Sequence, residues 1–267
     1  MDNYGLAIGV IYSEKCNTFK TIDAICEAGF KNVFIQWFDK ENWRESQLEQ
    51  LNYIRNKNLN VIFAHLGYDN INDIWLSEEE YNLKKCNNVE RYKKDIKDLH
   101  ESGIDLVVMH LTSKLVAPPF CEDGLARIRE IVNYAESLNV KIAFENTKIK
   151  GYLEYVLSNI KNNNVGVCYD IGHDHAHFKD SYDFSFFKNR FFAVHLHDNH
   201  GENDEHLLPF DGTIDYKKQI DDLKINGYKG YVTLEVSYPK NYLNMDLEEF
   251  YKEAYKRGKI LQKMFSK

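Results

Sequence analysis

Histidines and carboxylates recur along this chain at the ends of short apolar segments. The residues at such ends, or in the loops directly after them, include His65, His110, Glu145, Asp170, His173, His195, His197, Asp204, His206 and Glu235. Of the other histidines, His175 and His177 follow the sixth segment, and only His100 and His200 stand apart. Mixed imidazole and carboxylate ligands suit zinc, manganese, iron or cobalt better than calcium. Gathered in one place, these side chains would hold a divalent metal.

The elements that must position these residues alternate between short β-rich segments and longer segments of helical periodicity. The predicted strands are Leu6–Tyr12, Asn32–Phe38, Val61–Leu66, Asp105–Leu111, Lys141–Asn146, Val165–Asp170, Phe191–His197 and Tyr231–Val236. The predicted helices are Thr18–Ala28, Trp43–Lys57, Glu79–Ser102, Glu122–Leu138, Tyr152–Lys161, a short one before the seventh strand, Tyr216–Asn226 and Asp246–Lys263. Such alternation implies a parallel sheet with right-handed crossovers.

Eight β-then-α units in 267 residues predict an α/β fold, a single (β/α)8 TIM barrel forming one domain over residues 1–267. An open doubly wound sheet is the alternative, but the glycine-rich phosphate loop that usually follows one of its early strands is missing. TIM barrels carry their active sites at the C-terminal ends of the strands. Nearly all the candidate ligands fall at these ends, so we expect the active site on that face.

The alternation of side chains along each strand indicates that the candidate ligands point toward the barrel axis. Glu145 shares a strand face with Ala143, His110 with Val108, and Glu235 with Thr233. Small or branched side chains at the upstream positions suit a barrel interior. The acidic and imidazole groups would then lie above that interior and point toward the axis.

Composition narrows the class of protein. Hydrophobic residues make up 43% and charged residues 28% of the chain, which supports a sizeable core. The net charge of −7 argues against a nucleic-acid partner. The cysteines, with no CxxC pair, predict reduced thiols and hence a cytoplasmic protein; they are Cys16, Cys26, Cys86, Cys121 and Cys168. We expect neither a signal peptide at Met1–Tyr4 nor a membrane span, because no apolar run approaches about 20 residues.

Several motifs then carry a resemblance to a known family. They are AFEN at Ala143–Asn146, YDIGH at Tyr169–His173, HLHDN at His195–Asn199, DEHLLPFDGTIDY at Asp204–Tyr216 and TLEV at Thr233–Val236. In this order the set resembles the xylose isomerase-like TIM barrel superfamily over the whole chain. That superfamily includes sugar and sugar-phosphate isomerases and epimerases, inosose isomerases and dehydratases, and the endonuclease IV class, also called AP endonuclease family 2. The ordered set is specific for the superfamily and not for one activity.

The isomerase branch of the resemblance implies one metal held by four residues, Glu145, Asp170, His195 and Glu235. Its chemistry is proton abstraction beside a carbonyl, in which Glu145 and Glu235 would act in turn as base and acid. His173 would hydrogen-bond a substrate hydroxyl. The leading prediction is therefore a divalent-metal-dependent sugar or sugar-phosphate isomerase or epimerase that acts on a small carbohydrate, with a homo-oligomer left open.

The endonuclease branch is an alternative, a multi-metal phosphodiesterase acting on abasic DNA. Its additional ligands, for up to three metals, have counterparts here in His65, His110, His173, Asp204 and His206. Two features argue against it. The His-Pro-Gly motif of the nucleases is replaced by His110-Leu111-Thr112, and no loop rich in arginine and lysine is present.

A third alternative is a lyase, a dehydratase of a keto-sugar or keto-inositol that uses the same metal and base. Ketohexose epimerases of the family carry an acidic residue and an arginine where this chain has Gly151 and Gly201, so the substrate is expected to differ from a simple ketohexose. Trp37, Lys114 and His197 are further substrate-binding candidates. Trp37 could stack on a sugar face and Lys114 could bind an anionic substrate, although core packing and a solvated loop lysine are the alternatives.

Overall fold

Eight parallel strands form one sheet in the order β7-β6-β5-β4-β3-β2-β1-β8 in the computed structural model, which describes residues 4–12, 17–38 and 43–267. The strands are β1 (Leu6–Val10), β2 (Asn32–Trp37), β3 (Asn60–Leu66), β4 (Leu106–Met109), β5 (Lys141–Glu145), β6 (Val165–Asp170), β7 (Phe191–His195) and β8 (Val232–Leu234). A parallel bridge between Leu196 and Leu234 brings β7 and β8 together. The Leu196 backbone N–H donates to the Thr233 carbonyl at 2.9 Å, and that of Glu235 donates to the Leu196 carbonyl at 3.1 Å. The predicted (β/α)8 barrel is confirmed.

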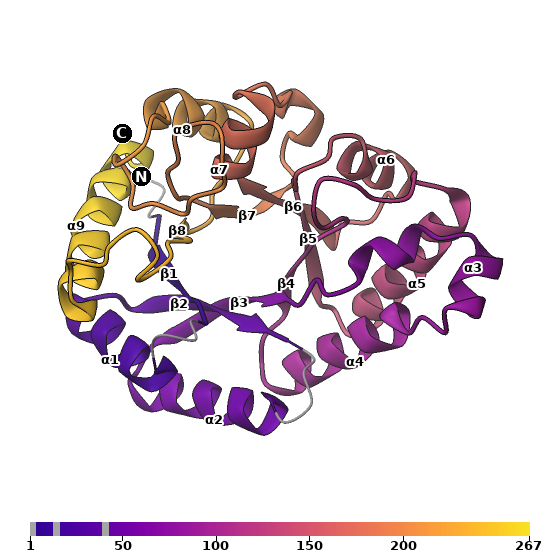
Figure 1. The fold of residues 1–267 in the computed structure, drawn as a ribbon, viewed down its shortest axis with the longest axis horizontal. Coiled ribbons are helices and arrows are strands. Elements are labelled where there is room, and N and C mark those ends of the chain that lie inside the picture. Colours follow the sequence, from indigo (N-terminus) through magenta and orange to yellow (C-terminus); the bar gives the residue numbers. More distant parts are fainter. Residues whose placement is uncertain (1–3, 13–16, 39–42) are drawn as a thin grey trace.

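Helices surround the strands (Figure 1). They are α1 (Thr18–Ala28), α2 (Trp43–Asn56), α3 (Glu78–Leu83), α4 (Asn88–Glu101), α5 (Glu122–Ser137), α6 (Tyr152–Asn159), α8 (Tyr216–Ile225) and α9 (Leu247–Phe265). Shorter turns are η1 (Ile71–Trp75), α7 (Ile171–His173), the π-helical η2 (Asp174–Phe178) and η3 (Phe184–Phe187). The last helix, α9, lies beside α1 at the start of the chain (Figure 1), so the outer layer also closes.

One predicted helix is wrong in its extent. The segment Glu79–Ser102 forms two helices, α3 and α4, with a break at residues 84–87 where Lys85 has a φ of 54°. Ser77 and Glu80 form a capping box at the start of α3. The Asn88 side chain donates to the Asn70 carbonyl at 2.9 Å, which ties the start of α4 to the loop after β3. Tertiary contacts at the break therefore override a helical periodicity that continues through it.

Two apolar clusters fill the molecule. The larger packs the outer faces of the strands against the helices. The smaller, which we call the inner cluster, lies inside the barrel and contains the buried residues Phe34, Phe63, Val108, Ala143, Cys168 and Ala193. Thr233, on the same face as Glu235, is also fully buried. The inner cluster is the apolar floor on which the strand-end residues stand.

Two simpler predictions concern thiols and membrane spans. The described cysteines, Cys26, Cys86, Cys121 and Cys168, are free. Cys16 and the residues Met1 to Asn3, which entered the predictions about thiols and a signal peptide, lie outside the described residues. Within the described part of the chain, no helix combines the length and the apolar character needed to cross a bilayer.

Candidate metal centre

The C-terminal ends of the strands bring the predicted site residues together. Each predicted ligand at the end of β3 to β7 stands two residues after a member of the inner cluster; the pairs are Phe63 and His65, Val108 and His110, Ala143 and Glu145, Cys168 and Asp170, and Ala193 and His195. Side chains two apart on a strand share a face. The polar residues therefore form a layer directly above the apolar floor, facing the barrel axis.

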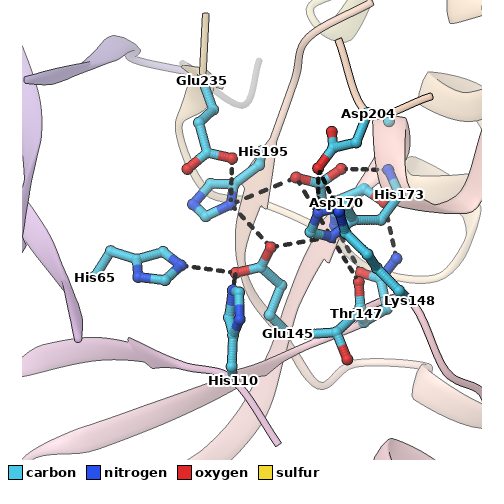
Figure 2. A network of polar contacts seen from close by, with 12 residues as sticks. His65, His110, Glu145, Thr147, Lys148, Asp170, His173, His195, Asp204 and Glu235 are labelled. Carbon is cyan, nitrogen blue, oxygen red and sulfur yellow. Dashed lines mark hydrogen bonds and ion pairs between the residues drawn. The ribbon is translucent and has the colours of Figure 1, made fainter. Parts of the chain in front are cut away.

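Four of these residues, which we call the quartet, are Glu145, Asp170, His195 and Glu235. One ligand atom from each lies within 4.8 Å of the others. The Nδ1 atom of His195 is 3.3 Å from Oε2 of Glu235, 3.5 Å from Oε1 of Glu145 and 3.7 Å from Oδ2 of Asp170 (Figure 2). All four residues are buried, and none exposes more than 6% of its surface. Three carboxylates thus surround one imidazole at the bottom of the barrel mouth.

Several polar atoms of the quartet have no hydrogen-bond partner among the described residues. They are Oε1 of Glu145 and both ring nitrogens of His195. Leaving buried polar or charged groups without partners costs free energy, so natural sites pair such groups or use them to bind ions. Carboxylate oxygens and an imidazole nitrogen are ligands of zinc, manganese, iron and cobalt. The donor set and its burial fit a divalent cation.

Electrostatics in the quartet favour ionised carboxylates. Burial raises the pKa of Glu145, but the imidazoles of His110 and His195 outweigh it and hold that pKa well below its usual range. Burial also raises the pKa of Asp170, and His173 and His197 outweigh it to leave a lowered value. For His195, burial lowers the pKa, but Cys168, Glu235 and Glu145 together raise it well above the ordinary value. A metal would take the place of the proton among these groups, because ligand atoms must be deprotonated to bind it.

A second group of residues, which we call the outer ring, surrounds the quartet; it consists of His65, His110, His173, Asp204 and His206. On one side, Nε2 of His65 lies 3.0 Å and Nε2 of His110 lies 3.3 Å from the same Oε2 atom of Glu145 (Figure 2). Nδ1 of His65 also lies 3.0 Å from the Leu66 carbonyl oxygen, to which it can donate. These contacts fix the orientation of the Glu145 carboxylate.

On the other side of the outer ring, Asp204 bridges two histidines. Its Oδ2 lies 3.2 Å from Nε2 of His173, and its Oδ1 lies 3.2 Å from Nε2 of His206. Burial raises the pKa of Asp204, but hydrogen bonds from His173 and His206 outweigh it and lower the pKa. Burial lowers the pKa of His206, and Asp204 raises it to about 9. The structure therefore joins residues from the loops after β6 and β7 into one charged group.

His197 is placed differently from its prediction as a substrate-binding residue. Its ring is fully buried, its Nε2 lies 3.1 Å from Oδ1 of Asp170, and its ring stacks on His206 at 4.1 Å. A Cβ atom on Gly172 would come within 1.9 Å of the His197 ring, so glycine is needed there. The prediction that His197 contacts the substrate is corrected, because the His206 ring covers it. Its contact with Asp170 instead orients that carboxylate.

A cavity of about 730 Å³ opens above the quartet. Its lining residues are Ile11, Gln36, His65, Tyr68, Asp69, Asn70, Asn72, Asp73, Lys84, His110, Thr112, Ser113, Lys114, Glu145, Thr147, Lys148, His173, Asp204, His206, Glu235 and Ser237. Lys114 is among them. Trp37 is not, since it is 1% exposed and belongs to the larger cluster on the outer face of the sheet. The predicted stacking of Trp37 on substrate is wrong, and strand alternation places Gln36 at the cavity instead.

Three residues near the quartet had no role assigned from the sequence. Asn146 joins the ends of β5 and β6, since its side chain donates to the Asp170 carbonyl at 2.8 Å and accepts from the Asp170 N–H at 2.7 Å. Tyr68 stacks on His110 with ring centroids 4.4 Å apart. Lys148 has its Nζ 3.5 Å from Oδ2 of Asp204 (Figure 2). The position of Asn146 directly after Glu145 was the available signal, whereas Tyr68 and Lys148 lie in loops whose paths were not predictable.

Comparison with known proteins now identifies the family. Residues 22–259 match the sequence profile described as "Xylose isomerase-like TIM barrel". The chain belongs to this family. The resemblance carried by the ordered strand-end motifs is thereby confirmed.

The chain is also similar to individual proteins in sequence and in structure. The chain is 27% identical over 191 residues to the uncharacterized protein MJ1311 of Methanocaldococcus jannaschii, a match to 65% of this chain and 64% of that protein. The matched region thus spans less than two thirds of that relative. A D-tagatose 3-epimerase-like protein has a TM-score of 0.72 and 21% identity, covering 98% of this chain and 97% of its own. D-psicose 3-epimerase from Clostridium cellulolyticum has a TM-score of 0.75 and 15% identity, covering 98% and 99%. These similarities extend the fold over nearly the whole chain.

Proposed function

We propose that this family member is a divalent-metal-dependent isomerase or epimerase of a small keto-sugar. The observation that carries the proposal is the quartet, in which two glutamates from β5 and from the end of β8 meet at the bottom of the cavity with an aspartate and a histidine. Oε1 of Glu145 and the His195 nitrogens have no hydrogen-bond partner among the residues described, as expected of atoms that serve as ligands.

The side chains support the chemistry as follows. Glu145, Asp170, His195 and Glu235 would hold the metal, which would polarise the carbonyl and hydroxyl oxygens of the substrate. Glu145 and Glu235 both line the cavity, so one carboxylate can take the proton from the carbon beside the carbonyl and the other can return a proton to the adjacent position or opposite face. His173, which also lines the cavity, would hydrogen-bond a substrate hydroxyl.

Two glycines bear on the choice of substrate. Gly151 and Gly201, which occupy the positions of an acidic residue and an arginine in ketohexose epimerases, have φ angles of 98° and 80°. Neither lines the cavity. The substrate contacts that those side chains make in the epimerases would therefore be replaced here. The structural neighbours named for ketose epimerases support the reaction type, and the glycines favour a different substrate.

The experiment is solvent-deuterium exchange into a panel of keto-sugars by the metal-loaded protein. Exchange should require the metal, and Glu145→Gln should lower its rate by about 10²–10⁴-fold, as expected for loss of a general base. Glu202→Gln, at an exposed glutamate in the loop after β7, is the matched control and should keep the wild-type rate. Full activity in both Glu145→Gln and Glu235→Gln would exclude the mechanism. Loss of water from the substrate would instead identify the lyase alternative.

One observation favours a second candidate, a multi-metal phosphodiesterase of the endonuclease IV type. The outer ring brings His65 and His110 to one oxygen of Glu145, and joins His173 and His206 through Asp204. Such groups could hold two further metals. A DNA backbone requires a basic surface, however, and the cavity lining has three lysines and no arginine in a chain of net charge −7. About three metals per chain and nicking of an abasic duplex would establish this candidate, and one metal without nicking would exclude it.

A further inference from the structure

The three lysines of the cavity lining differ in how their charges are balanced. Lys84 is neutralised by Asp73, whose Oδ1 lies 2.7 Å from its Nζ. Lys148 lies 3.5 Å from Oδ2 of Asp204, an oxygen that also faces His173. Lys114 is exposed, and its ammonium has no ion pair or hydrogen bond with any residue that the structure describes. Although the lining carries more carboxylates than lysines, the ammonium of Lys114 contacts none of them, and that of Lys148 is only partly balanced.

These two lysines belong to loops that are joined to each other. A hydrogen bond of 2.6 Å links the hydroxyls of Thr112, after β4, and Thr147, after β5. Lys114 follows Thr112 by two residues, and Lys148 follows Thr147 directly. Because β4 and β5 are neighbours in the sheet, the loops that carry Lys114 and Lys148 follow adjacent strands on one side of the cavity.

The backbone that carries Lys114 is held in place. The Asn72 side chain donates to the carbonyls of Ser113 at 2.9 Å and Val116 at 3.0 Å, and it accepts from the Ser113 N–H at 2.7 Å. Lys114 itself has a φ of 65°, a left-handed conformation that is unfavourable for a residue with a side chain. The bonds from Asn72 therefore hold the backbone on both sides of an unpaired lysine at the cavity.

An anionic group on the substrate explains this arrangement. Sugar hydroxyls are neutral and need no unpaired cation, whereas a phosphate ester carries a charge of about −1.5 to −2 and three acceptor oxygens. Lysine binds phosphate well as a point charge. The cavity of about 730 Å³ lies in the upper part of the usual range for ligand sites, so it has room for a substituent beyond the sugar carbons.

We propose that Lys114 and Lys148 form a phosphate subsite, and that the substrate is a keto-sugar phosphate whose carbonyl end faces the quartet. The reaction rests on the function proposed above, but the subsite does not. A single phosphate is small enough for a local pair of lysines, in contrast to the extended basic surface that a DNA backbone requires.

The first test compares D-ribulose 5-phosphate with D-ribulose as substrates of the metal-loaded protein. Wild type should prefer the phosphorylated sugar in kcat/KM. Lys114→Met should lower that preference about ten- to hundredfold, as expected for loss of a charge-assisted contact. Lys84→Met, which removes a cavity lysine already balanced by Asp73, is the matched control and should change the preference less than about twofold. An equal loss in both lysine variants, or no preference in wild type, would overturn the subsite.

The second test is calorimetric binding of inorganic phosphate to the metal-loaded protein, which needs no turnover. Lys114→Met should weaken binding at least about tenfold, and Lys84→Met should not. Phosphate affinity that is unchanged by Lys114→Met would mean that phosphate binds the metal alone, and would overturn the subsite. Lys114-dependent binding without proton exchange in any keto-sugar would retain the subsite and reject the proposed reaction. Deuterium exchange into both D-ribulose 5-phosphate and D-ribulose, together with phosphate binding that does not depend on Lys114, would reject the subsite and retain the proposed reaction.

Discussion

The quartet and the outer ring differ in how the protein satisfies their polar atoms. Both ring nitrogens of His195 have no hydrogen-bond partner among the described residues. Both nitrogens of His173, by contrast, have one, in the Asn146 carbonyl at 3.0 Å and Asp204 at 3.2 Å. His65 is likewise bonded at both nitrogens.

This difference distinguishes His195, whose ring nitrogens are both available to a ligand, from His65 and His173, whose nitrogens already have partners. Much of the outer ring can be stable as a hydrogen-bonded frame, although Oδ1 of Asp204 also has no hydrogen-bond partner among the described residues. The quartet gathers three buried carboxylates around an imidazole, an arrangement that a cation stabilises. A clustering of histidines and carboxylates is therefore not sufficient to identify metal ligands, and the two unpartnered nitrogens set His195 apart from His65 and His173 within the cluster.

The largest effect should come from the quartet. Glu235→Gln removes a ligand and one of the two proton-transfer groups, so kcat/KM for exchange should fall by about 10³–10⁴-fold. The bound metal should also decrease, as measured by elemental analysis. His65→Gln is the comparison from the outer ring, and it should retain the metal. Loss of the metal from both variants would erase the distinction between the two groups.

Removing the metal should destabilise the protein, because a cation that binds only the folded state adds its binding free energy to stability. At a free metal concentration of 100–1,000 times its dissociation constant, this contribution is about 3–4 kcal/mol. Chelation should then lower the melting temperature on the order of 10 °C, as measured by calorimetry. The Glu235→Gln variant should respond much less. An equal response in both proteins would contradict metal binding by the quartet.

A smaller effect is expected at His197, which contacts Asp170 and stands behind the quartet. His197→Gln should weaken metal affinity about 10–100-fold while the fold is retained, as is typical when a residue that orients a ligand is changed. Metal titration of the folded variant measures this. His200→Gln, at an exposed histidine beside Glu205, serves as control and should bind metal normally. Unchanged affinity in His197→Gln would mean that Asp170 does not depend on His197 for its orientation.

The last effect leaves the metal site itself intact and concerns the pH dependence of stability, which the outer ring sets in the metal-free protein. The pKa of His206 is raised to about 9 because Asp204 outweighs the effect of burial. A raised pKa in the folded state contributes stability that is complete below the unfolded value of about 6.5 and is lost as pH rises through about 9. Chemical unfolding should show the free energy of unfolding falling by up to about 3 kcal/mol across that window, because each unit of pKa shift corresponds to about 1.4 kcal/mol. The His206→Gln variant should lack this pH-dependent component of stability. If the variant and the wild type had the same pH profile, the pairing of His206 with Asp204 would be contradicted.

The two corrected site residues show where prediction from the sequence ends. Alternation along β2 was available for Trp37, since Phe34 and Gln36 share the face opposite to it, and it would have indicated the outer cluster. No comparable signal existed for His197. It shares a strand face with His195, but the ring of His206, nine residues farther along the chain, covers it.

The chain's own pattern determined the eight β-then-α units, the strand faces that meet inside the barrel and the residue types at the strand ends. These follow from period-two alternation and short-range periodicity, which are local properties. Only the tertiary structure determined which ligand atoms lack partners, which histidines are covered and which lysine at the mouth is unpaired. Those properties depend on contacts between loops, such as the bonds from Asn72 to the Lys114 loop, that are distant in sequence. The sequence thus located the site at the strand ends, and the packing of the loops determined which role each of its residues can have.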